Sequence, residues 1–110
     1  MTVNELAAKT GFEVIGDNES LSKEIKGCFI GDLLSWVLGH GQEDEAWITV
    51  QFHPNVVAVA VLKEFSCLIL AQGAIPGEEG LEKAKEAHLA ILKTELSAYE
   101  IAKKLVELGI

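Results

Sequence analysis

Short apolar runs alternate with helical patterns along most of this chain, and this alternation limits the possible folds more than any other feature. The runs at 25–30, 46–52, 67–70 and 90–92 are rich in residues that favour strands, and a segment of helical spacing or length follows each one. Strands that alternate with helices are typical of parallel sheets covered on both faces. The sequence therefore predicts an α/β protein, a three-layer α/β/α fold with a mostly parallel sheet of four to five strands.

Capping residues mark where several of the helices should begin. Thr2 and Ser97 each start a capping-box pattern, ahead of the first and the last helix. Asp32 stands before another apolar helical segment, so we expect it to be the N-cap of that helix. The segment 54–65 is apolar on every side, but its length fits the crossover between two parallel strands, and we expect a helix there. A short alternating run at 12–15 adds one more strand.

Length and charge narrow the functional classes. A chain of 110 residues, 49% of them hydrophobic, is long enough for one domain with its own core. The net charge of -8 would repel phosphate backbones and anionic lipid, so nucleic acid and membranes are not expected as partners. The amino terminus lacks the basic region and the long apolar stretch of a secretory signal, which makes the cytoplasm the expected location.

The cysteines and histidines do not form metal-binding or redox motifs. Cys28 and Cys67 each lie alone in an apolar run, so we expect both thiols to be free and buried. None of His40, His53 and His88 has a second ligand at metal-binding spacing, and we expect neither a metal site nor a cofactor. His88 falls on the apolar side of a predicted helix and is expected to pack there.

Catalytic motifs are also missing from the sequence. The chain contains no Gly-x-Ser-x-Gly elbow, no Gly-x-x-x-x-Gly-Lys phosphate loop and no Gly-x-Gly-x-x-Gly turn. The acidic run at 43–45 is typical of a solvated loop. We therefore name no catalytic residue and expect a protein that binds without catalysing a reaction.

Candidate ligand-binding residues follow from the predicted topology. In an open parallel sheet, ligands bind at the carboxyl ends of the strands, near the point where the strand order reverses. The loops that follow the predicted strands contain eight polar or glycine residues suited to such a site: Gly31, Asp32, Gln51, His53, Asn55, Gln72, Gly73 and Thr94. Of these, His53 is the residue most expected to contact a ligand, because it follows the strongest predicted strand.

Several short segments along the chain are similar to one known family. They are Val14 together with residues 2–6, 27–28, 31–35, 47–50, 68–70 and 96–100. Because of these segments, the chain resembles a stand-alone DRTGG domain that spans residues 1–110. Such a domain is similar to the amino-terminal domain of HPr kinase. That family is named for an Asp-Arg pair after one central strand and a Thr-Gly-Gly after the next. The matching positions here hold Phe52-His53 and Ala71-Gln72-Gly73, so only Gly73 is kept.

The resemblance implies a regulatory role. DRTGG domains occur beside CBS modules in a regulated pyrophosphatase and in phosphotransacetylases, where their role is regulatory or structural and includes self-association. The resemblance therefore implies a non-enzymatic regulatory or ligand-sensing domain. Such a domain would bind a nucleotide-like or other small anionic ligand at the strand carboxyl ends. The apolar helix at 33–38 favours a homodimer with Trp36 at the contact. Two alternatives stay open: a small phosphoryl- or acyl-transfer enzyme with His53 as base, and a structural protein partner of a larger complex.

Overall fold

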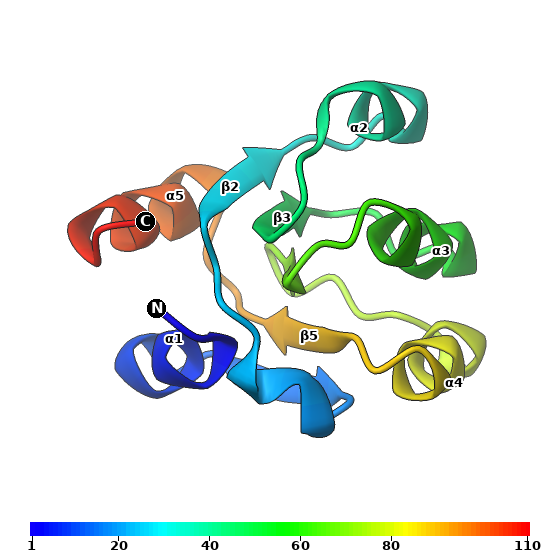
Figure 1. Cartoon of the computed structure of the whole chain (residues 1–110), viewed down its shortest axis with the longest axis horizontal. Helices are drawn as coiled ribbons and strands as arrows, with labels where there is room; N and C mark the ends of the chain where they lie inside the picture. Colours follow the sequence, from blue (N-terminus) through cyan, green and yellow to red (C-terminus); the bar gives the residue numbers. More distant parts are fainter.

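The chain folds into a five-stranded sheet with helices on both faces (Figure 1). The structure is a computed structural model that describes all 110 residues. Its elements, in chain order, are α1 (Val3–Thr10), β1 (Glu13–Gly16), the 3-10 helix η1 (Glu19–Ser22), β2 (Gly27–Ile30), α2 (Leu34–His40), β3 (Glu45–Thr49), α3 (Pro54–Leu62), β4 (Cys67–Leu70), α4 (Glu78–Glu86), β5 (Ala90–Lys93) and α5 (Ala98–Glu107). None of these helices has both the length and the apolar character needed to cross a bilayer.

The sheet is mostly parallel, as predicted. Its strand order is β1-β5-β4-β3-β2, with β2 to β5 parallel and β1 antiparallel to β5. Figure 1 shows α2, α3 and α4 on one face of the sheet and α1 and α5 on the other. The three-layer prediction is therefore confirmed. The parallel strands follow one another in chain order, however, so the expected reversal of strand order does not occur among them.

Two apolar layers, one on each side of the sheet, hold the helices in place. Ala46, Ile48 and Ile69 face α1 and α5, whereas Trp47 and Leu68 face the layer of α2, α3 and α4. All of the residues of β4 are buried, because helices cover this strand on both faces. This double burial explains why the central strands are continuous apolar runs without alternation.

The helix ends agree with the capping patterns in the sequence. The Thr2 side chain accepts a hydrogen bond from the Glu5 backbone N–H at 3.1 Å, and Gly11 ends α1 in the left-handed conformation. Ser97 and Glu100 form the complete reciprocal capping box of α5. The helix predicted from topology within 54–65 is present as α3.

The prediction that Asp32 caps a helix is wrong. Leu33 is the N-cap of α2, and the Asp32 carboxylate instead accepts hydrogen bonds from the Thr49 hydroxyl at 2.6 Å and from the Val50 backbone N–H at 2.9 Å. The second bond takes the Val50 N–H away from the sheet. For this reason β3 ends at Thr49, earlier than the predicted strand at 46–52.

The prediction that His88 packs on an apolar helix face is also wrong. The helix α4 ends at Glu86, and His88 follows it with a left-handed backbone, at a φ of 56°. Its side chain is 61% exposed and lies beside Asp17 and Glu19. The turn at the end of α4 therefore rotates His88 out of the helical pattern that the sequence indicated.

The two thiols are free, but only one of them is fully buried. Cys67 is buried in β4, whereas Cys28 is half-buried because β2 is an edge strand. In the register of the sheet Ala46 lies between them. Their Cα atoms are thus two strand spacings apart, about 9.6 Å, beyond the roughly 7 Å that a disulfide can bridge.

Candidate functional site

The loops that follow the parallel strands meet at one edge of the sheet, which we call the carboxyl edge. Parallel strands end on the same side, so the loops after β2, β3, β4 and β5 all lie here. All eight predicted ligand residues are in these loops or at the first turn of the helix that follows. The structure places them in three separate groups.

The first group joins Gly31, Asp32 and Gln51. The Gln51 side-chain amide, in the loop after β3, donates to the Asp32 carbonyl at 3.1 Å. At the start of that loop the Asp32 carboxylate accepts the hydrogen bonds from Thr49 and Val50. The Trp47 indole N–H donates to the Gly31 carbonyl at 2.9 Å. Asp32 therefore ties the loop after β2 to the loop after β3, and its carboxylate is occupied by bonds within the chain.

The second group is His53 with Asn55, at the start of α3. The His53 Nδ1 atom accepts a hydrogen bond from the Asn55 backbone N–H at 3.1 Å, so the imidazole is the N-cap of this helix. A ring nitrogen that accepts a hydrogen bond carries no proton. In the neutral ring the Nε2 atom is then the donor that remains for a ligand.

The third group joins Gln72, Gly73 and Thr94. The Gly73 backbone N–H donates to the Thr94 carbonyl at 2.9 Å, and both Gln72 and Gly73 have positive φ angles. A Cβ atom at Gly73 would come within 2.7 Å of the Glu95 carboxylate. Gly73 therefore allows close approach of the loop after β5, and Glu95, which the sequence analysis missed, puts a negative charge beside this group.

No cavity collects the three groups. Gln51 and His53 line a hollow of only about 10 Å³ between α3 and α4. Thr94 lines a different, open hollow of about 500 Å³, where Lys93 and Lys104 are balanced by the carboxylates of Glu13 and Glu95. A ligand as large as a nucleotide would therefore lie over this edge of the sheet, in contact with its surface.

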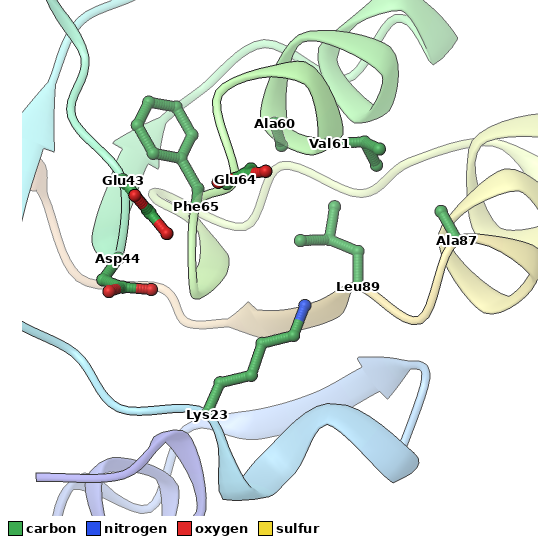
Figure 2. A pocket seen from close by; sticks show the side chains of 9 residues that line it. All are labelled: Lys23, Glu43, Asp44, Ala60, Val61, Glu64, Phe65, Ala87 and Leu89. Atoms are coloured by element: carbon green, nitrogen blue, oxygen red, sulfur yellow. The ribbon is translucent and has the colours of Figure 1, made fainter.

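A cavity of about 370 Å³ lies at the opposite, amino-terminal edge of the sheet. Figure 2 shows the Lys23 side chain reaching into it below Leu89, with the carboxylates of Glu43 and Asp44 on one side. Glu64 adds a third carboxylate to the lining, so positive groups are favoured here over anions. Of the acidic run at 43–45, predicted to be a solvated loop, Glu43 and Asp44 line this cavity together with Lys23, whereas Glu45 begins β3.

Exposed apolar side chains gather at the carboxyl edge. Six large apolar residues at strand ends, in the adjoining loops or in the first turn of α2 are exposed: Ile30, Leu33, Trp36, Val50, Phe52 and Ile75. We call this set the carboxyl-edge apolar surface. Trp36 stacks on His40 with ring centroids 3.9 Å apart, which restricts the indole although it is 58% exposed.

Comparison with known proteins identifies the family. No curated protein sequence matches the chain. A solved structure of the CBS and DRTGG domains of the regulatory region of Clostridium perfringens pyrophosphatase, complexed with its activator diadenosine tetraphosphate, is similar with a TM-score of 0.73. It is 15% identical, and the match covers 93% of this chain but 44% of that one. The profile of the DRTGG domain matches residues 5–108. This chain belongs to the DRTGG domain family.

Proposed function

We propose that this chain is a regulatory binding domain without catalytic activity, and that it forms a homodimer through the carboxyl-edge apolar surface. The observation that carries the proposal is the gathering of six exposed apolar side chains at one edge. Leu33, Trp36 and Phe52 are each more than half exposed, at 65%, 58% and 60%. Large apolar side chains that are exposed near one another mark interaction sites on proteins.

The charge distribution supports a second copy as the partner. The chain carries a net charge of -8, so two copies would repel each other over most of their surfaces. The segment 27–39 is an exception, because Asp32 is its only charged residue and that carboxylate is bonded within the chain. A self-contact here buries apolar side chains without bringing free carboxylates together.

The regulatory part of the proposal rests on the family and on the geometry. The similar structure is a regulatory region. Two threonine hydroxyls of this chain bond to a carboxylate, and one of these pairs, Thr2 with Glu5, belongs to the amino-terminal cap of α1. The Thr49 hydroxyl does bond to Asp32, but Thr49 is 2% exposed and cannot meet a substrate.

Sedimentation velocity across a micromolar concentration range tests the homodimer. We expect the wild type to sediment as a dimer, and both Trp36→Ala and Phe52→Ala to shift it toward the monomer. Tyr99→Ala is the matched control, because Tyr99 is 79% exposed but lies on α5, on the other face of the sheet. A wild type that stays monomeric at high concentration, or a Tyr99→Ala variant that dissociates as readily, would contradict the proposal.

A nucleotide-like anion bound at the carboxyl edge is the finer form of the regulatory proposal. It is favoured by the similar structure, which is complexed with diadenosine tetraphosphate. In this chain the donors would be the His53 Nε2–H, the side-chain amides of Gln51, Asn55 and Gln72, and the Thr94 hydroxyl. Glycines at 31 and 73 would allow close approach of a phosphate to the backbone.

A thermal-shift screen against mono- and dinucleotides tests this ligand class. A ligand at a hundred times its Kd stabilises the folded state by about 2.7 kcal/mol, so binding raises Tm. His53→Ala should remove the shift, whereas His53→Asn can still cap α3 and separates loss of the imidazole from loss of the helix cap. Turnover of a stabilising ligand would favour the transferase alternative, and no shift with any nucleotide would favour a structural partner.

A further inference from the structure

We propose that Asp17, Glu19 and His88 form a binding site for one divalent transition-metal ion of the zinc class. These residues lie at the amino-terminal edge of the sheet, away from the carboxyl-edge apolar surface. Asp17 and Glu19 come from the turn and 3-10 helix after β1, and His88 comes from the turn between α4 and β5. The fold thus joins side chains that are about 70 residues apart in sequence, which is why no local motif predicts the site.

The distances from the His88 Nδ1 atom to the two carboxylates are close to those in a metal coordination shell. One ligand atom of each residue lies within 4.8 Å of the other two. The His88 Nδ1 atom is 3.3 Å from a Glu19 carboxylate oxygen and 3.6 Å from an Asp17 carboxylate oxygen. Zinc holds nitrogen and oxygen ligands at about 2.1 Å, which in a tetrahedral shell places neighbouring donors about 3.4 Å apart. Imidazole with carboxylate is also a donor set that zinc accepts.

Asp17 is held in place for this role. Its side chain is 10% exposed, and one carboxylate oxygen accepts the Ser20 backbone N–H at 3.0 Å. The other oxygen is the one that faces His88. A hydrogen-bonded second oxygen fixes the orientation of a ligating carboxylate, as outer-shell partners do in known metal sites.

The charge of the cluster calls for a cation. No lysine forms an ion pair with either carboxylate, and the nearby Lys23 ammonium donates to the His88 carbonyl. A nearly buried carboxylate such as Asp17 is costly unless a positive charge accompanies it, and a divalent ion held between the three side chains would supply that charge. The same turn also contains Ser20 Oγ, the one buried side-chain oxygen without a hydrogen-bond partner.

Isothermal titration of untagged, chelator-treated protein with zinc chloride at neutral pH tests the proposal. We expect one saturable site and a rise in Tm on zinc addition. His88→Gly should lower the affinity at least about tenfold, since even outer-shell losses cost 10–100-fold. Glycine suits the left-handed backbone at 88, so this variant removes the imidazole without backbone strain.

Two further variants make the result decisive. Asp17→Asn keeps an oxygen that can accept the Ser20 N–H but removes the charge, so it should weaken zinc binding even if His88→Gly folds poorly. His40→Ala removes an exposed histidine elsewhere, on α2, and should bind zinc as the wild type does. The proposal would be overturned by wild-type protein that shows no saturable zinc binding. It would also be overturned if His88→Gly and Asp17→Asn both bound zinc as tightly as the wild type.

Discussion

Cys28 and Cys67 lie on the same face of the sheet, on either side of Ala46. Burial, with a smaller effect of the nearby Glu45 carboxylate, raises the pKa of the Cys28 thiol to about 11. Burial, with the neighbouring Cys28 as a lesser cause, raises the pKa of Cys67 to about 12. Both thiols are therefore almost entirely protonated at neutral pH, and the thiolate is the form that reacts.

Native alkylation with iodoacetamide should consequently be slow for both thiols. At pH 8 about one Cys28 thiol in a thousand is ionised, and its rate should rise about tenfold per pH unit up to its pKa. Cys67 should react only when the fold opens, so denaturant should accelerate it more than Cys28. Single Cys28→Ala and Cys67→Ala variants assign each rate. Fast labelling of Cys67 in the native state at pH 8 would show that β4 is not buried as described.

Roles of individual residues were harder to predict than the elements that contain them. Asp32 has the local signal of an N-cap, but its carboxylate binds Thr49 and Val50, 17 and 18 positions away. Glu95 reaches Gly73 through a pairing of two loops, and His88 reaches Asp17 across the sheet edge. Contacts of this range depend on strand order, which periodicity and capping patterns do not contain.

At the scale of elements, α5 offers the most direct test. Its amino terminus is closed by two reciprocal hydrogen bonds, from the Glu100 backbone N–H to Ser97 Oγ at 3.2 Å and from the Ser97 backbone N–H to the Glu100 carboxylate at 3.1 Å. The hydrogen bonds to Ser97 hold the pKa of Glu100 below its usual value. The ionised Glu100 therefore contributes to the stability of the fold. This contribution to stability is present above the unfolded-state pKa of Glu100 and is lost as the pH falls through its lower folded-state pKa.

Replacement of the capping serine should therefore destabilise the protein. We expect Ser97→Ala to lower the free energy of unfolding by about 1 kcal/mol, measured by urea denaturation at neutral pH. Ser22→Ala is the matched control, because Ser22 is exposed and its side chain forms no hydrogen bond, and it should change stability by less than about 0.5 kcal/mol. Equal losses in the two variants would show that the Ser97 cap contributes little.

Elements were predictable where the sequence carries a local signal. The capping patterns located α1 and α5, and the apolar segment at 54–65 became a helix because a crossover needs one. Ends of strands were less predictable. β3 stops at Thr49 because a side chain outside the strand takes the next N–H, although Val50 itself favours strands.

For the whole molecule, the alternation of strands and helices was sufficient to predict the layers. It was not sufficient to predict the order of the strands. The expected ligand crevice assumed a reversal among the parallel strands, but these follow one another in chain order. The candidate residues do reach one edge, because that requires only parallel direction, yet they form three groups without a common cavity.

The order of the strands also has a consequence for how the chain folds. Each parallel pair joins residues about 20 positions apart, whereas β1 pairs with β5 across about 80. Because closing a longer loop costs more chain entropy, the consecutive units from β2 to β5 should assemble first, and the amino-terminal segment should dock last. Pulse-labelling hydrogen exchange during refolding should then protect β3 and β4 before β1. The first 16 residues would in that case add the last strand to an already formed parallel sheet and stabilise it.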